Sequence, residues 1–180
     1  GDDIVNNCTN LEYSSEKLDK TASNVVKLLL QRGWHVAFAE SCTGGLLSQT
    51  ITSVPGASAV YELGICTYAN RIKNKFLGVP NDMLDSFGAV SPEVALAMVS
   101  GLSRCSDAEI CVSVTGIAGP DGGTPEKPVG TVWLGFYVNG KTFTRLPELW
   151  LLKNKSRGNI RLAAANYAFG IIEEILTEDF

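Results

Sequence analysis

The sequence predicts an α/β sandwich with one mixed sheet, folded as a single domain. Short apolar runs of strand length alternate with segments of helical periodicity along most of the chain, which is typical of strands joined by crossover helices. Near the C-terminus this order changes to two strands joined by Asn139-Gly140, a strong signal for a two-residue hairpin. Because a hairpin adds antiparallel strands, the sheet is expected to be mixed.

The first elements follow from apolar periodicity and turn residues. Apolar residues at helical spacing from Leu18 predict a helix that ends near Gly33. We expect a strand over residues 34–39, and after it a helix over 46–52. A bent strand or a strand pair is expected over 59–68.

Helix signals mark the middle of the chain. Asn70 is predicted to N-cap a short helix that runs to about Leu77. Ser91-Pro92-Glu93 supplies an N-cap, a proline at the first helical position and a first-turn acid for a helix to about Ser103. The β-branched run 109–114 predicts a buried strand.

The last third contains the hairpin and a closing helix. Residues 117–128 predict a loop rich in glycine and proline, and residues 129–138 and 142–152 predict the hairpin strands. A final helix is expected over 156–176. We therefore divide the chain into a polar lead-in, residues 1–16, and one domain, residues 17–180.

Composition excludes several classes of function. The 180 residues carry a net charge of −4 with scattered lysines and arginines, so we expect no nucleic-acid partner. No apolar run reaches the roughly 18 residues that span a bilayer, and we expect no membrane partner. A single histidine and the absence of a carboxylate cluster argue against a metal site.

The cysteines favour a reducing compartment, and we expect a cytoplasmic protein. Their number is odd and no pair has C-x-x-C spacing. Three of them lie in or beside apolar runs and are interpreted as small core residues. The five are Cys8, Cys42, Cys66, Cys105 and Cys111.

Three polar residues fall at the predicted C-terminal ends of strands: Ser41, Tyr68 and Thr115. In open α/β sheets the ligand crevice lies outside those strand ends. If the three strands are parallel neighbours, the three residues converge on one crevice.

The turn from Glu40 to Gly45 places Ser41 between a strand and a helix. Such a turn can expose a nucleophile while its amides, here those of Thr43, Gly44 and Gly45, receive an oxyanion. The alternative is that Ser41 or Thr43 merely caps the helix.

A serine nucleophile needs a base, and His35 is a poor one. It begins the strand that Ser41 follows, so the two lie roughly 20 Å apart at strand spacing. Lys73, in the first turns of the helix beyond Tyr68, can face the same crevice, provided burial or a cation lowers its pKa by about three units. Lys73 as a solvated helix residue and Tyr68 as an ordinary strand-end aromatic are the alternatives.

Two further features are candidates for contacting a ligand. The glycine-rich residues 115–128 can cradle phosphate or cover a planar ring, or they form a long surface turn. Arg157 and Arg161 share a helix face and either clamp a phosphate or face solvent. We predict substrate contacts from residues around this crevice: Glu40, Asn70, Thr115, Gly116, Gly119, Gly122 and Arg157.

The chain resembles the C-terminal domain of the competence/damage-inducible protein CinA over about residues 17–176. The resemblance is carried by Glu40-Ser41-Cys42-Thr43-Gly44-Gly45, by Thr67-Tyr68-Ala69-Asn70 with Lys73, by Gly88-Ala89-Val90-Ser91, and by the long run from Val112 to Val132. It implies a three-layer α/β/α domain that is often a homo-oligomer. Two positions depart from the family: Ala69 stands where serine is usual, and Lys155-Ser156 precedes Arg157 in place of Gly-Asp.

Members of this family include amidases that convert nicotinamide mononucleotide to nicotinate mononucleotide and ammonia. The resemblance therefore implies a small-molecule nucleotide substrate, no cofactor, Ser41 as nucleophile, and Lys73 and Tyr68 as its partners. One rival is a non-catalytic nucleotide-binding or competence-associated protein that retains the pocket. Another keeps hydrolysis but makes Cys42 the nucleophile.

Overall fold

The protein, described by a computed structural model over residues 13–178, contains one mixed five-stranded sheet. Most of the predicted lead-in, with Cys8, and the last two residues of the predicted domain lie outside the described residues. The strand order is β2-β1-β3-β4-β5. Strands β1, β2 and β3 are mutually parallel, β4 pairs antiparallel with β3, and β5 pairs antiparallel with β4. The strands are β1 (Val36–Glu40), β2 (Tyr61–Cys66), β3 (Ile110–Gly116), β4 (Val132–Val138) and β5 (Lys141–Arg145).

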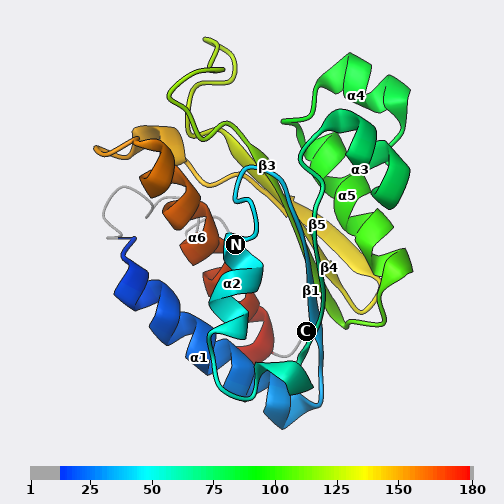
Figure 1. Cartoon of the computed structure of the whole chain (residues 1–180), viewed down its shortest axis with the longest axis vertical. Coiled ribbons are helices and arrows are strands. Elements are labelled where there is room, and N and C mark those ends of the chain that lie inside the picture. Colours follow the sequence, from blue (N-terminus) through cyan, green and yellow to red (C-terminus); the bar gives the residue numbers. More distant parts are fainter. Residues whose placement is uncertain (1–12, 179–180) are drawn as a thin grey trace.

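Helices cover both faces of the sheet (Figure 1). One face carries α1 (Ser15–Arg32), α2 (Leu46–Thr52) and α6 (Arg157–Thr177). The other carries α3 (Asn70–Leu77), α4 (Asn81–Phe87) and α5 (Pro92–Cys105). The predicted α/β/α sandwich with a mixed sheet is confirmed.

Strand β1 is buried on both faces and divides the core in two. Phe38 packs toward α6, with its ring 5.8 Å from that of Phe169, whereas Ala37 and Ala39 face α5. Alternate strand residues point to opposite faces of the sheet, so Ala37 and Ala39 lie on the same side. Their small side chains let α5 lie close to the sheet. Strand β1 is therefore held firmly between the two layers of helices, and with it the position of the residue that follows, Ser41.

The predicted hairpin turn is confirmed, but its strands are shorter than expected. Asn139 and Gly140 adopt φ values of 46° and 91°, as a two-residue turn of the favoured hand requires. Strand β5 ends at Arg145, because Pro147 has no N–H to donate and residues 149–151 turn into a 3₁₀ helix.

Other expectations need correction. Asn70 is not an N-cap but the first helical residue of α3, where Ala69 is the cap. Of the two alternatives for residues 59–68, the single strand is the one present, but β2 is shorter than predicted (Tyr61–Cys66), and helix α4 was not predicted. A first-turn acid, Asp82, and the C-cap Gly88 were the available signals for α4.

The cysteine prediction holds only in part. Cys111 is buried, but Cys66 and Cys105 are exposed. Cys66 ends the edge strand β2, and Cys105 is the last residue of α5, so neither is covered by a further element.

Helix α5 approaches α3 through Gly101. A Cβ at this position would overlap the carbonyl oxygen of Leu77, which is backbone and cannot move aside. We expect Gly101→Ala to lower the free energy of unfolding by about 2–4 kcal/mol, as overpacking does. Gly170→Ala is the matched control in α6, where a Cβ meets nothing within 4 Å, and it should gain up to about 1 kcal/mol of helix propensity. Urea denaturation measures both, and equal stability of the two variants would contradict the close contact.

Candidate active site

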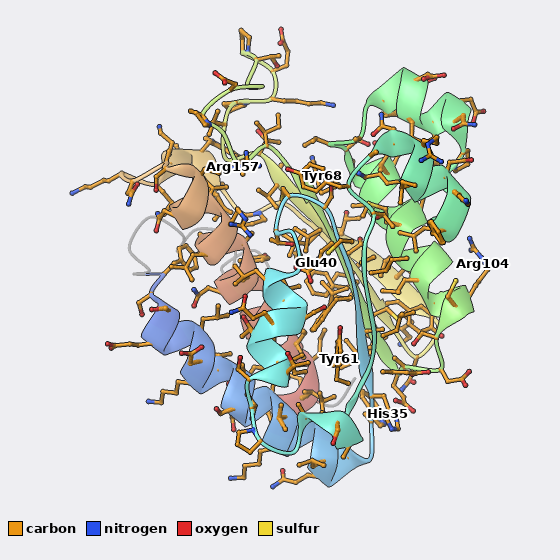
Figure 2. All side chains as sticks on the ribbon, in the orientation of Figure 1. His35, Glu40, Tyr61, Tyr68, Arg104 and Arg157 are labelled. Atoms are coloured by element: carbon orange, nitrogen blue, oxygen red, sulfur yellow. The ribbon has the colours of Figure 1, made fainter. Side chains whose placement is uncertain are left out.

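The C-terminal ends of β1, β2 and β3 lie side by side, since Glu40 pairs with both Cys66 and Val114 in parallel register. The parallel arrangement assumed from the sequence is therefore present. In Figure 2, Tyr68 and Arg157 lie near this end of the sheet and His35 lies at the opposite end. His35 is exposed there and its ring lies 3.3 Å from the Glu109 carboxylate, so it is remote from Ser41, as expected.

Ser41 occupies a tight turn between β1 and α2. Its N–H donates to the Val114 carbonyl at 3.0 Å, and its own carbonyl accepts from the Gly44 N–H at 3.0 Å. Gly44 and Gly45 have φ values of 61° and 102°, which favour glycine. The N-cap of α2 is Gly45, with no side-chain cap, so neither Ser41 nor Thr43 serves as the cap.

Glu40 takes the place of that cap. Its carboxylate accepts hydrogen bonds from the N–H groups of Leu47 at 2.9 Å and Ser48 at 3.1 Å, in the first turn of α2. The side chain is fully buried. The predicted substrate contact of Glu40 is therefore not made in this arrangement, because the carboxylate is enclosed and already holds the helix amides.

The amides of the turn are divided between structure and potential binding. Gly44 donates to the Ser41 carbonyl and is not available to an oxyanion. Within residues 13–178, no acceptor pairs with the N–H of Thr43 or Gly45. Thr43 is fully buried, whereas Gly45 is partly exposed, so the predicted oxyanion set of Thr43, Gly44 and Gly45 is reduced to the Gly45 N–H.

Lys73 approaches Ser41 from α3, on the face of the sheet opposite to α2. Helix α3 starts three residues after Thr67, and its fourth residue, Lys73, turns back with Nζ 3.1 Å from Ser41 Oγ. The same nitrogen donates to the carbonyls of Thr67 and Tyr68, each at 2.8 Å. The side chain is 1% exposed, and this burial lowers its pKa to about 8. A solvated Lys73 is therefore ruled out.

This arrangement suits a neutral amine. A neutral lysine has two N–H groups and one lone pair, and two carbonyls lie within hydrogen-bond distance of Nζ beside Ser41 Oγ. If the two carbonyls take the two hydrogens, the lone pair is left for the hydroxyl hydrogen of Ser41. Protonation reverses the direction of that bond, so that the ammonium donates to Oγ. The pair can thus exchange one proton over 3.1 Å.

Cys42 is poorly placed to replace Ser41. Its side chain is buried, and burial raises the pKa of the thiol to about 12. The thiolate is the reactive form, and it is scarce near neutral pH at such a pKa.

Tyr68, Arg157 and the glycine-rich loop are joined by hydrogen bonds. Arg157 donates to the Tyr68 hydroxyl at 3.0 Å and to the Gly119 carbonyl at 2.7 Å. Tyr68 therefore holds Lys73 through its carbonyl, while its exposed side chain reaches the arginine. Arg161, one turn further along α6, donates to the Thr43 carbonyl at 2.9 Å and steadies the nucleophile turn.

The remaining predicted contacts separate into internal and exposed residues. Thr115 lies within β3, not beyond it, and its buried hydroxyl donates to the Ala89 carbonyl at 2.8 Å, so it fastens a neighbouring segment. Gly116 pairs with Val132, where a Cβ would be crowded. Asn70 and Gly122 are exposed at the start of α3 and in the loop, respectively.

Sequence reasoning missed Thr67, whose carbonyl accepts from Lys73 and whose buried hydroxyl has no hydrogen-bond partner among the described residues. The Oγ1 of Thr43, a residue predicted from the sequence for its amide, is likewise enclosed without a partner in this part of the chain. Buried hydroxyls are usually satisfied by a partner. The available signal for Thr67 was its position directly before Tyr68.

Residues 13–178 lack two features that would point to other functions. No group of three or more His, Cys, Asp or Glu side chains is placed to hold a metal ion. No helix in this part of the chain has the length and apolar character to cross a membrane.

Comparison with known proteins identifies the family. The CinA C-terminal domain matches residues 18–176. The chain belongs to the CinA C-terminal domain family. It is also similar to the nicotinamide-nucleotide amidohydrolase PncC of Enterobacter agglomerans, with 41% identity over 156 residues, which cover 86% of this chain and 93% of that protein.

Longer relatives and solved structures agree. A putative competence-damage inducible protein of Caldanaerobacter subterraneus is 48% identical over 152 residues, 84% of this chain but 36% of that protein. The chain thus spans about a third of the length of such CinA relatives. The crystal structure of the competence/damage inducible protein CihA from Agrobacterium tumefaciens has a TM-score of 0.84 at 38% identity, covering 90% of this chain and 96% of that one.

Proposed function

We propose that this CinA-family domain is a cytoplasmic nicotinamide-nucleotide amidohydrolase that converts nicotinamide mononucleotide to nicotinate mononucleotide and ammonia. The similarity to PncC supports the reaction class and the substrate. The observation that carries the mechanism is the buried amine of Lys73, with its lowered pKa, 3.1 Å from Ser41 Oγ. A serine paired with a neutral lysine is an established solution for acyl transfer without histidine.

In the first half-reaction, Lys73 accepts the hydroxyl proton as Ser41 Oγ attacks the carboxamide carbon. The developing oxyanion is received by the N–H of Gly45, which is partly exposed and has no acceptor within the described residues. The carbon–nitrogen bond breaks as the Lys73 ammonium returns the proton to the nitrogen. Ammonia leaves, and a nicotinate ester remains on Ser41.

In the second half-reaction, water hydrolyses the ester. Lys73 accepts a proton from the water as its oxygen attacks the ester carbonyl, and then gives that proton to the departing Ser41 Oγ. The carbonyls of Thr67 and Tyr68 keep the lysine nitrogen in place through both steps. The free enzyme is thereby restored.

The nucleotide part of the substrate would meet Arg157. Its guanidinium has five N–H groups, and the contacts to Gly119 and Tyr68 use one from each terminal nitrogen, so further donors remain for a phosphate. We infer that Gly122 and Asn70, exposed near the same end of the sheet, border the bound ribose phosphate. A homo-oligomer, as the family resemblance implies, is part of this proposal and is testable by light scattering.

The pH dependence of kcat should follow Lys73. Because the lysine must be neutral to act as base, and burial sets its pKa at about 8, the rate should rise about tenfold per pH unit below 8 and level off above it. Single-turnover rates between pH 6 and 9.5 measure this. A flat profile, or a rate that falls as pH rises toward 8, would contradict the assignment of Lys73 as base.

The proposal is tested by incubating the purified protein with nicotinamide mononucleotide and measuring ammonia and nicotinate mononucleotide. Equal amounts of the two products are expected, and added chelator should not change the rate. If the folded protein releases no ammonia over that pH range but still binds the nucleotide by calorimetry, the domain is a binding module and the amidase proposal fails.

A further inference from the structure

A hollow lies away from Ser41, on the face of the sheet covered by α4 and α5. Its volume is about 630 Å³, within the range of small-molecule pockets, and neither Ser41 nor Lys73 lines it. Residues 88–91 lie between the two regions, since the Ala89 carbonyl binds Thr115 on β3 while Val90 and Ser91 line the hollow. The hollow is therefore distinct from the Ser41–Lys73 pair, although residues 125–128 of the glycine-rich loop line it.

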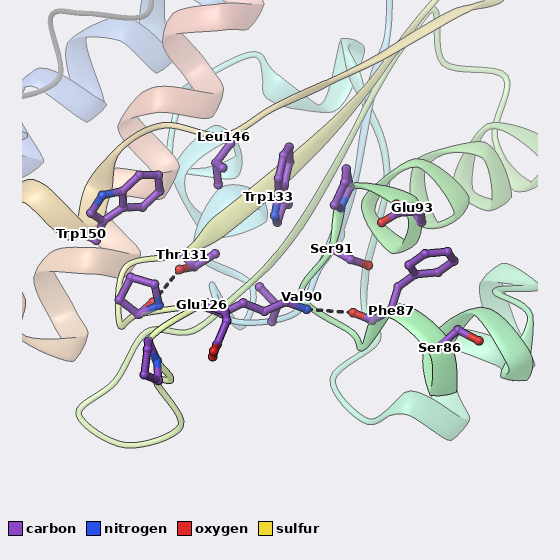
Figure 3. Close-up of a pocket in the computed structure, with 14 residues that line it drawn as sticks. Ser86, Phe87, Val90, Ser91, Glu93, Glu126, Thr131, Trp133, Leu146 and Trp150 are labelled. Carbon is purple, nitrogen blue, oxygen red and sulfur yellow. Dashed lines mark hydrogen bonds between the residues drawn. The ribbon is translucent and has the colours of Figure 1, made fainter.

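Aromatic side chains form its walls. Figure 3 shows Trp133 and Trp150 on one side, with Leu146 between them, and Phe87 with Glu93 on the other. Phe87 is 47% exposed, so part of its ring is accessible from the hollow that it lines. The faces of aromatic rings carry partial negative charge, so walls of this kind attract cations.

The charged lining residues have unequal partners. Lys127 donates from Nζ to the Phe87 carbonyl at 2.8 Å. Two carboxylates, those of Glu93 and Glu126, also line the hollow. Across residues 13–178, neither has a lysine or arginine within ion-pair distance. The Lys127 ammonium is thus bound to a backbone carbonyl, and the carboxylates of Glu93 and Glu126 have no positively charged partner among the described residues.

We propose that this hollow is a binding site for an organic cation, a quaternary ammonium group on an aromatic or alkyl body. The ammonium would lie against the rings of Trp133, Trp150 and Phe87, and the carboxylate of Glu93, with that of Glu126, would supply the opposing charge. A quaternary ammonium has no N–H to satisfy, so a pocket of ring faces and carboxylates meets its needs. This inference does not depend on the amidase proposal.

The test uses benzyltrimethylammonium as the probe and the three indole N–H signals of ¹⁵N-labelled protein as the readout. Trp133 and Trp150 should shift saturably on titration, while Trp34, which packs against Arg32 at the start of β1, should not. Benzyl alcohol, the neutral aromatic control, should bind at least about tenfold more weakly, because it lacks the charge that the rings and carboxylates attract.

Charge variants sharpen the test. Glu93→Gln should weaken the cation about fivefold, and adding Glu126→Gln should weaken it further. Glu16→Gln is the matched control, since Glu16 also lies in the first turn of a helix, α1, outside the hollow. The proposal is overturned if the indoles do not shift, if benzyl alcohol binds equally well, if the double variant retains full affinity, or if inorganic phosphate shifts the two indoles and the cation does not.

Discussion

Replacing Ser41 with alanine should abolish ammonia release from nicotinamide mononucleotide, with kcat lowered by at least about 10³-fold. The change removes Oγ, the atom that lies 3.1 Å from Lys73 Nζ and would form the ester. The hydroxyl forms no other hydrogen bond within residues 13–178, so the fold and the binding of nucleotide should survive. Single-turnover release of ammonia, with calorimetric binding of the nucleotide, measures the two effects separately.

Cys42→Ala is the matched control for Ser41→Ala. Cys42 is adjacent in sequence and similarly buried, but its thiol pKa is raised to about 12, so its removal should cost some stability and little activity. Mass spectrometry of quenched wild-type reactions should find a nicotinoyl group on the peptide that contains both residues, and fragmentation should place it on Ser41. Loss of turnover in Cys42→Ala, with Ser41→Ala still active, would reverse the assignment.

The strands and their turns could be predicted from the sequence more accurately than the residues at which the strands begin and end. Asn139-Gly140 determines its turn by local backbone preference alone, and such signals survive in any tertiary context. The ends of β5 and the start of β4 depend on which backbone groups find partners across the sheet, and apolar residues beyond Arg145 do not reveal that. Helix α4 is short, and its boundary residues lie in a polar stretch where they do not stand out as helix signals.

The site divides in the same way. Ser41 and Lys73 could be named as candidates because strand ends and the first turns of helices place side chains by simple geometry, and the family resemblance then implied their roles. Glu40 could not be assigned, because a carboxylate beside a serine looks equally suited to substrate or to backbone, and only the fold shows that it holds the amides of α2. The same limit applies to Thr115, whose hydroxyl is used internally.

Replacing Lys73 with methionine should separate the base from the packing. Methionine has nearly the same length but no amine, so kcat should fall at least about 10³-fold. Taking a lysine out of a buried site that lowers its pKa removes a desolvation cost, so the thermal midpoint should stay equal or rise, even though the carbonyls of Thr67 and Tyr68 lose their donor. Arginine at this position should be equally inactive, because a guanidinium stays protonated at every pH the assay can use.

Chemical rescue then distinguishes a base from a structural support. Lys73→Ala leaves space for a small amine, and added ethylamine should restore part of the activity in proportion to the concentration of its neutral form, so that rescue increases with pH. If Lys73 only positioned Ser41, a free amine would not restore activity, because it is not attached to the protein and could not hold Ser41 in place. Failure of rescue in a variant that still binds nucleotide, together with an unchanged pH profile in Lys73→Met, would show that the proton goes elsewhere, and Tyr68 would become the group to test.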